Sequence, residues 1–307
     1  MIHEYALEPE LVATWGNRHE FRYFIENFGL GQPRIVSRYP KPWKRLVWEA
    51  FRSDDEFEKT RMTELLVRLS ERMVHRRNYV WESQRTWLEN AHNEHARFPF
   101  HAVLARANST NHPSTLVAEE LGAATPLWAA PRGVTIARSA VEMAAAVVDM
   151  LRIADIVIFV DPYFRPGRIE NRRPLEAFLS AVLNARPLDM PTRIEVHTSL
   201  DEDRSGTRAY FEDQCRRNLP RCVPDGMRLI LSRLRERPGG QRLHNRYILT
   251  DVGGLIFGGG LDEGAAGEID DVTLMDRPQY ELRWSQHATE PMAFEVTEAQ
   301  VEIQSGR

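Results

Sequence analysis

Cysteine is scarce in this chain, and its scarcity excludes two kinds of fold. The 307 residues include only Cys215 and Cys222, with no Cys-x-x-Cys pair. Disulfide-stabilised small domains and structural zinc sites need more thiols at closer spacing. His92 and His95 also miss the His-Glu-x-x-His order of helical zinc sites. We therefore predict reduced thiols, no metal site and no cofactor.

Long apolar runs are absent as well. No stretch approaches the roughly 18 to 20 apolar residues that cross a bilayer, and residues 1–10 lack a basic segment followed by an apolar one. We expect a cytoplasmic protein without a membrane partner. With 42% hydrophobic and 27% charged residues the chain resembles average globular proteins, so we expect it to fold throughout, as two domains.

Positive charge is in deficit, since 40 lysines and arginines face 44 acidic residues, a formal net charge of -4. This argues against a protein that coats nucleic acid non-specifically, because that mode depends on a broad positive surface. A local arginine cluster is the best candidate for contact with a nucleic-acid backbone, although a solvated helix face and loop explains it nearly as well. The cluster comprises Arg216, Arg217, Arg221, Arg228, Arg233, Arg235, Arg237 and Arg242.

The first part of the chain, residues 1–115, is predicted to be mainly helical. Its apolar residues between positions 57 and 73 follow helical spacing beside many charges. Residues 108–133 are rich in Ser, Thr, Asn, Pro and Gly, which is typical of a connector. We therefore place a second domain at 116–307. The helical stripe consists of Phe57, Met62, Leu65, Leu66, Leu69 and Met73.

The second domain alternates strands with helices. Residues 156–160 are an apolar run of strand length, residues 194–198 are expected to form a second strand, and residues 140–151 and 174–183 are expected to form helices. This alternation predicts an α/β layer structure. Further strands are expected at 227–231, 247–250 and 254–257.

The segment 242–251 carries the clearest chemical signal. If it is a strand, alternate residues point to opposite faces, so His244 and Arg246 share one face. Arginine offers a planar fork of donors that matches two phosphate oxygens. Histidine supplies a nucleophile or proton carrier near neutral pH. The pair therefore predicts a phosphate site.

Around this segment the sequence resembles the phospholipase D superfamily. The resemblance spans about residues 134–287 and includes the run 161–164 (Asp-Pro-Tyr-Phe), the run 243–247 with Asp251, and the glycines 258–260. The family signature is His-x-Lys-x4-Asp, followed six residues later by Gly-Ser-x-Asn. His244, Asp251 and Gly258 match it, whereas Arg246 replaces lysine, Gly259 replaces serine and Leu261 replaces asparagine.

The resemblance implies a mixed sheet flanked by helices and metal-independent phosphodiester chemistry. In this family, a histidine of one motif attacks phosphorus and a histidine of a second motif protonates the leaving oxygen. This chain has one such motif, since His197 is not followed by a basic residue at the right spacing. Single-motif members of the family pair two chains about a twofold axis, so the resemblance predicts a homodimer.

The same resemblance assigns roles to individual residues. His244 forms the phosphohistidine or acts as general acid, and Arg246 holds the non-bridging oxygens. Asp251 fixes local geometry or biases the protonation of the histidine. The residues predicted to contact substrate are Gly258, Gly259 and Arg242.

These features predict a hydrolase: a phosphodiesterase or nuclease that acts on DNA, with bacterial antiviral defence as the context that the resemblance suggests. The alternative is a catalytically degenerate domain that serves as a nucleic-acid- or partner-binding subunit. The departures at Gly259 and Leu261 favour the alternative, and the retained His244, Arg246 and Asp251 favour the enzyme. In either case the N-terminal region is a candidate for docking onto a larger protein complex. DNA, RNA and other phosphodiesters, such as lipid head groups or nucleotides, remain open as substrates.

Overall fold

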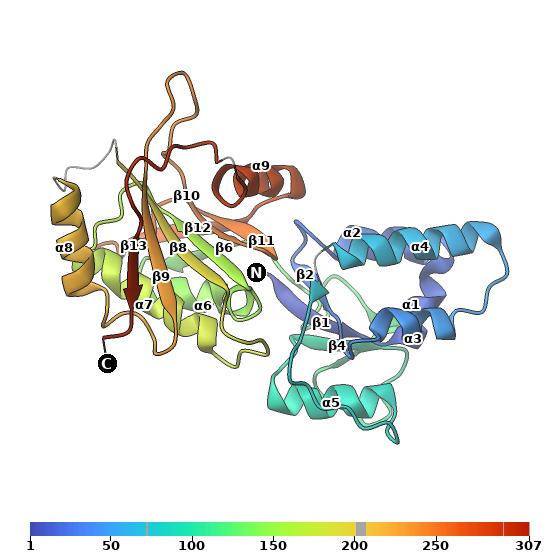
Figure 1. Cartoon of the computed structure of the whole chain (residues 1–307). Coiled ribbons are helices and arrows are strands. Elements are labelled where there is room, and N and C mark those ends of the chain that lie inside the picture. The colour runs from blue at the N-terminus through green and yellow to red at the C-terminus, as the bar shows by residue number, and fades with distance from the viewer. Residues whose placement is uncertain (72, 201–206, 291, 307) are drawn as a thin grey trace. The chain divides into compact units, whose positions relative to one another are not determined.

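The computed structural model describes residues 1–71, 73–200, 207–290 and 292–306. The chain forms two compact units (Figure 1). The N-terminal unit is Met1–Arg132 with Ala185–Asp189, and the C-terminal unit is Gly133–Asn184 with Met190–Arg307. No helix in the described part of the chain is both long and apolar enough to span a bilayer.

The N-terminal unit is built on a parallel sheet, which corrects the expectation of a mainly helical region. The sheet has the order β3-β2-β1-β4-β5, and every neighbouring pair is parallel. Parallel strands need long crossovers, and the helices provide most of them. The strands are β1 (His3–Leu7), β2 (Arg34–Ser37), β3 (Met73–Val74), β4 (Ala102–Ala105) and β5 (Thr115–Val117). The helical elements are α1 (Pro9–Val12), η1 (Ala13–Gly16), α2 (Arg18–Asn27), α3 (Trp43–Ala50), α4 (Glu56–Ser70), α5 (Trp87–Arg97) and η2 (Ala118–Glu120).

The expected domain boundary between residues 115 and 116 lies inside β5. Because β5 pairs with β4, residues 115–117 belong to the first sheet. The units divide between Arg132 and Gly133, at the end of the predicted connector 108–133.

The helical stripe predicted from the sequence is correct in its middle and wrong at its ends. Met62, Leu65, Leu66 and Leu69 are buried on α4, where they join the core of the N-terminal unit. Phe57 is 76% exposed in the first turn of α4, and Met73 belongs to β3. The helical spacing of apolar residues extends beyond both ends of the buried face of α4. Only the packing of the N-terminal unit decides which of these residues are buried.

A buried ion cluster lies in the N-terminal unit. The Arg76 side chain is fully buried, and its Nε and Nη2 donate to the two carboxylate oxygens of Glu4 at 2.8 and 2.7 Å. Its Nη1 donates to Glu94 Oε1 at 3.1 Å. Its guanidinium also lies 3.6 Å from the Phe100 ring centroid. One arginine therefore compensates two carboxylates that are shielded from water.

The C-terminal unit confirms the predicted α/β class with a mixed sheet flanked by helices. The sheet order is β13-β9-β8-β7-β10-β11-β12-β6. Strands β7, β8 and β9 are parallel, and the other neighbouring pairs are antiparallel. The strands are β6 (Gly133–Ala137), β7 (Ile156–Val160), β8 (Arg193–Ser199), β9 (Arg228–Leu234), β10 (Arg246–Thr250), β11 (Gly253–Phe257), β12 (Ile269–Leu274) and β13 (Val301–Gln304). The helices are α6 (Ala140–Leu151), α7 (Ile169–Leu183), α8 (Arg208–Asn218) and α9 (Arg277–His287).

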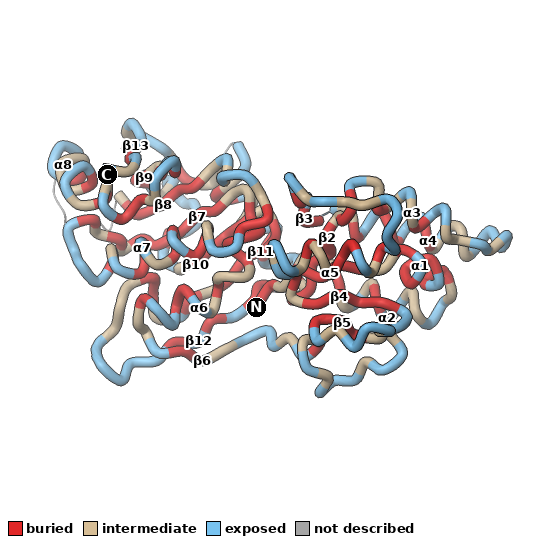
Figure 2. The backbone as a smooth tube through the Cα atoms, turned by 90° about the horizontal axis from the view of Figure 1, so that it is seen from below, coloured by how far each residue is buried: buried red, intermediate tan, exposed pale blue. Residues whose placement is uncertain are grey.

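The pairing of the central strands brings several chain segments to one sheet edge. Tyr247 of β10 pairs with Val160 of β7 in antiparallel register, so the start of β10 faces the end of β7. Arg246 pairs with Phe257, so the glycines after β11 lie at the same edge. The inner strands are largely buried (Figure 2). Polar side chains that could take part in a reaction therefore lie beyond the ends of these strands.

We expect Arg76→Met to lower the free energy of unfolding of the N-terminal unit by about 3–5 kcal/mol, because it leaves the buried Glu4 without its counter-charge and leaves Glu94 paired only with the partly exposed Arg97. Urea titration of the full-length protein measures this change. Arg22→Met is the matched control: Arg22 pairs with Glu26 on the surface of α2, and we expect a loss within about 1 kcal/mol. Equal losses in the two variants would contradict a special role for the buried cluster.

Candidate active site

His244 and Arg246 lie close together at the sheet edge, although they do not share a strand. Arg246 is the first residue of β10, whereas His244 belongs to the irregular segment 241–245 that precedes it. The expected alternation along one strand is therefore wrong for His244. Its side chain is exposed, and Arg246 is half-buried.

Tyr163 joins the two residues. It follows β7, and its hydroxyl lies 2.7 Å from His244 Nδ1. The two rings meet edge to face at 85°. On the same tyrosine, the guanidinium carbon of Arg246 lies 4.8 Å from the ring centroid, within cation–π range. Tyr163 was not predicted as a site residue, although its place directly after an apolar strand was a signal that could have found it.

The Tyr163 contact leaves one histidine nitrogen available. Because Nδ1 is engaged by the phenol, Nε2 is the nitrogen of His244 that can meet a ligand. When the Nδ1–H donates to the phenolic oxygen, Nε2 carries the lone pair and can act as a nucleophile. When the ring is doubly protonated, Nδ1–H still donates to the phenolic oxygen, and Nε2–H can act as an acid. Both roles require the Tyr163 contact that fixes the imidazole ring of His244.

Asp161 fixes the backbone on which Tyr163 stands. Its Oδ1 accepts the Tyr163 N–H at 2.9 Å, and its Oδ2 accepts the Leu261 N–H at 3.3 Å. Burial raises the pKa of this carboxyl, and Asp262 adds to the rise, whereas the Tyr163 N–H and the Arg246 charge oppose it. Asp161 therefore ties the loop after β7 to the loop after β11.

The guanidinium of Arg246 can donate hydrogen bonds to an anion. Its Nε is buried and has no hydrogen-bond acceptor among the described residues. Its side chain is held from one side by the Tyr163 ring. A planar guanidinium in this setting can present parallel N–H groups to two oxygens of a phosphate.

The two glycines predicted to contact substrate lie against charged side chains. The Gly259 N–H donates to Asp270 Oδ1 at 2.7 Å. A Cβ at Gly259 would lie 3.0 Å from Arg138 Nε, and one at Gly258 would lie 3.0 Å from Asp270 Oδ1. A serine at position 259 would therefore displace Arg138. Leu261, where the family has asparagine, is buried and uses its backbone to bind Asp161.

Asp251 lies at the opposite end of β10 from His244. Its Oδ1 accepts the N–H groups of Asp155 and Ile156 at 2.9 and 3.0 Å, where β7 begins. Seven residues of extended chain separate it from His244 by roughly 20 Å. The expectation that Asp251 biases the histidine's protonation is corrected by this distance, and its contacts are those of a residue that fixes β10 against β7.

The arginine cluster expected to meet nucleic acid does not form a free basic surface. Most of its members pair with carboxylates on neighbouring turns or strands, so much of their charge is compensated. Arg242, predicted to contact substrate, is exposed and lies 4.0 Å from Glu236. The other pairs are Arg216–Glu212, Arg217–Asp213, Arg228–Glu302, Arg233–Glu298 and Arg237–Glu295.

A second histidine group is buried behind the sheet edge. His197 Nε2 lies 2.6 Å from Glu195 Oε2, and His197 Nδ1 lies 3.2 Å from His287 Nδ1. Burial opposes ionisation of Glu195, but hydrogen bonds from His197 and Arg193 outweigh it and lower its pKa to about 2. Burial and the neighbouring His197 hold the pKa of His287 well below its ordinary value. Both histidine side chains are buried, so this group stabilises the fold and does not offer a second site motif.

We expect Asp251→Ala to lower the free energy of unfolding by about 1–2 kcal/mol, because two half-buried N–H groups lose their acceptor. Chemical denaturation measures the loss. Asp251→Asn keeps an acceptor oxygen and should lose less. An unchanged stability in Asp251→Ala would contradict the role in joining β10 to β7.

The His287 environment predicts an acid-labile C-terminal unit. Below about pH 6.5 the unfolded chain binds a proton at this residue that the folded chain excludes, so the free energy of unfolding falls as the pH falls. Glu195 adds a further loss as the pH drops from 4.5 towards its folded pKa of about 2. Denaturation between pH 7 and 5 should show a weaker pH dependence in His287→Gln. An unchanged slope in His287→Gln would overturn the assignment.

Comparison with known proteins gives little beyond this geometry. No family model matches the chain, and no curated protein matches it. Among solved structures, half of the chain is similar to a phospholipase D family member, Nuc from Salmonella typhimurium, at 13% identity and a TM-score of 0.29. The match covers 50% of this chain and 90% of that one. An identity and a TM-score this low support no functional conclusion. The side chains of the site are therefore the basis for the proposed function.

Proposed function

We propose that the C-terminal unit is a metal-independent phosphodiesterase that cleaves nucleic acid through His244. The observation that carries the proposal is the held histidine: its Nδ1 lies 2.7 Å from the Tyr163 hydroxyl, its ring is exposed, and Arg246 lies over the same tyrosine. A fixed imidazole beside a guanidinium supplies a nucleophile and an anion holder, the two groups that displacement at phosphorus needs.

The reaction has two displacements. In the first, the lone pair of His244 Nε2 attacks phosphorus, an N–P bond forms and one P–O ester bond breaks. The leaving oxygen takes its proton from an acid on the far side. In the second, the far-side group, now deprotonated, takes a proton from water as the water oxygen bonds to phosphorus. The N–P bond breaks, and the phosphate monoester leaves as the histidine is restored. Tyr163 holds the ring through both steps.

Arg246 stabilises the charge that develops on the non-bridging oxygens. A guanidinium kept in place by an aromatic ring loses little freedom when the transition state forms. Asp161 and Asp262 lie near it and limit how much positive potential the site presents. This balance suits a diester, which carries one negative charge, better than a phosphate monoester.

We propose a homodimer because the first displacement needs an acid that protonates the leaving oxygen, on the side of the phosphorus opposite His244. The histidines of the described C-terminal unit are His197, His244 and His287, and the first and last are buried in the group around Glu195. A second His244, from another copy of the chain, would supply the proton across a twofold axis. Its own Nε2 is equally exposed for that role.

Nucleic acid is the proposed substrate, with DNA as the first choice and bacterial defence as the proposed context. The formal net charge of -4 favours binding limited to the site over binding along a long duplex face. The competing function, a degenerate binding subunit, predicts the same contacts without turnover. A cleavage assay separates the two.

The test is cleavage of labelled single- and double-stranded DNA and RNA, and of bis(p-nitrophenyl) phosphate, in EDTA. We expect the wild type to cleave and His244→Ala to lose at least about a hundredfold in rate, because the covalent step is removed. His197→Gln is the matched histidine control, and it should retain activity to the extent that it folds.

Three outcomes would count against the proposal. Cleavage that EDTA abolishes would mean that a metal does the chemistry. Binding of oligonucleotide without cleavage of any substrate would favour the degenerate binding subunit. A protein that is monomeric by light scattering and cleaves at an undiminished rate would rule out the shared site.

A further inference from the structure

A cavity of about 630 Å³ lies in the N-terminal unit, at the edge of the sheet where the parallel strands end. Its lining residues all belong to the segments that follow the carboxyl ends of β1, β2, β3 and β4. Because these strands are parallel, their carboxyl ends meet at one edge, and the segments that follow them gather there. The lining includes Glu10, Thr14, Phe51, Glu58, Trp81 and Arg106.

The strand order places this cavity at a point where the direction of the chain across the sheet reverses. From β1 the chain proceeds to β2 and β3 on one side, and it then crosses to β4 and β5 on the other. The segments that follow the neighbouring strands β1 and β4 therefore diverge. In open α/β sheets, ligands bind in the crevice outside the carboxyl ends of the strands at such a point. A second cavity, of about 500 Å³, shares Thr14 and Arg106 with the first.

Hydrogen bonds hold the walls of the larger cavity in place. Glu8 Oε2 accepts the backbone N–H of Arg106 at 2.7 Å, which joins the segment after β1 to the segment after β4. Arg61 Nε donates to the Gly16 carbonyl at 2.6 Å and joins α4 to η1. A Cβ at Gly16 would lie 3.0 Å from the Phe51 ring, so glycine permits this close approach. The cavity is therefore formed without a ligand.

The charge of the lining argues against a phosphate. Among the described residues, three carboxylates and two guanidinium groups line the cavity. Two of these carboxylates, Glu10 and Glu58, have no ion pair within residues 1–71, 73–200, 207–290 and 292–306. The guanidinium of Arg106 is compensated, because its Nε lies 3.4 Å from Glu8 Oε2. The lining is therefore negative, and a phosphate would meet net repulsion.

The turn after β1 also lacks the features of a phosphate-binding loop. In dinucleotide-binding sheets, glycines follow the first strand and let the backbone approach the pyrophosphate. Here residues 8–10 are Glu-Pro-Glu, and Pro9 has no N–H to donate. A carboxylate such as Glu10 accepts hydrogen bonds from hydroxyl or amino groups. The lining therefore suits a ligand that offers donors and carries no negative charge.

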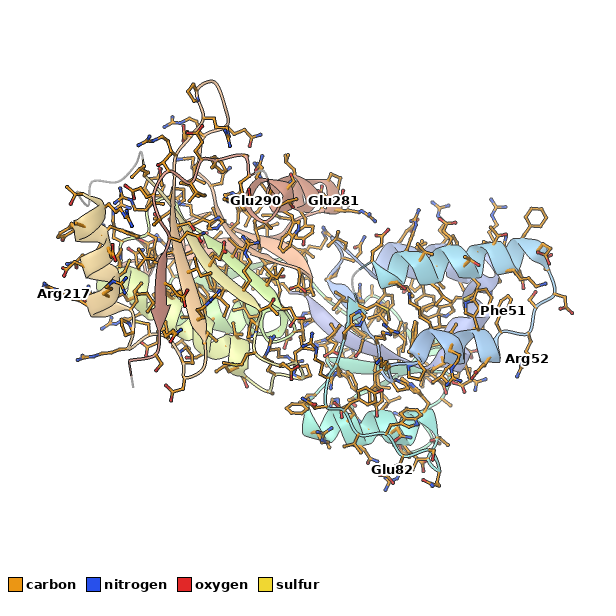
Figure 3. The ribbon with its side chains drawn as sticks, viewed as in Figure 1. Phe51, Arg52, Glu82, Arg217, Glu281 and Glu290 are labelled. Atoms are coloured by element: carbon orange, nitrogen blue, oxygen red, sulfur yellow. The ribbon has the colours of Figure 1, made fainter. Side chains whose placement is uncertain are left out.

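Aromatic rings line the same cavity. Trp81 is partly exposed, and its ring packs against Tyr39 at a centroid distance of 5.8 Å. The Tyr39 hydroxyl donates to the carbonyl of Val80 at 3.0 Å, which fixes the backbone next to Trp81. Phe51 and Arg52 lie in the segment that joins α3 to α4 (Figure 3), and both contribute to the lining. An aromatic ring that is already fixed stacks on the flat face of a base at little cost in side-chain freedom.

We propose that this cavity binds a nucleoside without a phosphate. The base stacks on an aromatic ring of the lining, and the ribose hydroxyls donate to a carboxylate, as they do to the acidic residue of α/β dinucleotide sites. The volume of about 630 Å³ lies within the range of small-molecule sites. The proposal is independent of the function proposed for the C-terminal unit, because every residue that lines the cavity belongs to the N-terminal unit.

Isothermal titration of the full-length protein with adenosine, guanosine, cytidine and uridine tests the proposal. We expect at least one of them to bind about tenfold more tightly than its 5′-monophosphate, because the lining repels the added charge. We also expect it to bind about tenfold more tightly than its 2′-deoxy form, because that form lacks one hydroxyl donor to a charged acceptor.

Variants of the lining locate the site. Glu10→Gln combined with Glu58→Gln should abolish the preference over the 2′-deoxy form and over the 5′-monophosphate. Trp81→Leu should weaken the ribose and 2′-deoxy forms alike, about tenfold, because each loses the same stacking contact. The matched control is Glu26→Gln combined with Glu64→Gln, which removes two exposed carboxylates that line neither cavity. Its affinities should stay within about twofold of the wild type.

Four outcomes would count against the proposal. Failure of the wild type to bind any nucleoside at millimolar concentration would overturn it, and so would unchanged affinities in both the carboxylate and the Trp81 variants. A 5′-monophosphate bound more tightly than its nucleoside would overturn the exclusion of phosphate. Free ribose bound as tightly as the nucleoside would overturn the role of the aromatic rings. If Trp81→Leu fails to fold by circular dichroism, the carboxylate variant decides alone, since Glu10 is exposed and Glu58 is only half-buried.

Discussion

The antiparallel pairing of β10 with β7 is the constraint on which the candidate site depends. It sets the end of β7 against the start of β10, so Tyr163 reaches His244 and Arg246. A slip of one residue would turn every side chain of β10 to the other face. Asp251 opposes such a slip, because it accepts two backbone N–H groups at the start of β7. His244 and Asp251 therefore lie at opposite ends of β10, and Asp251 binds the backbone at the start of β7.

Buried charge stabilises both units in a similar way. Arg76 compensates two carboxylates in the N-terminal unit, and Glu195 accepts from Arg193 and His197 in the C-terminal unit. Such groups tolerate burial only when every partner is present, so each is sensitive to loss of one member. They explain several polar residues whose chemistry resembles that of active sites but whose contacts are internal. His197 is the clearest case.

The distribution of arginine links the fold to the proposed chemistry. Most arginines that follow α8 in the sequence are paired with carboxylates, which keeps the surface nearly neutral. Arg246 differs, because its guanidinium lies against the Tyr163 ring at the edge where β7 ends. Anion binding concentrated at one edge agrees with a net charge of -4, whereas a general nucleic-acid coat does not.

The sequence by itself determined the strands β7 to β11 of the C-terminal unit and the pair His244 and Arg246, because apolar runs and motif spacing are local properties. It did not reveal β6, β12 and β13. It did not reveal the parallel sheet of the N-terminal unit, whose strands are short and, like Ala102–Ala105, weak in β-propensity. Only the tertiary structure decided that Tyr163 holds His244 across 81 positions of sequence, and that Asp251 does not. The physical reason is that sheet register joins residues distant in sequence and separates residues that a motif places close together.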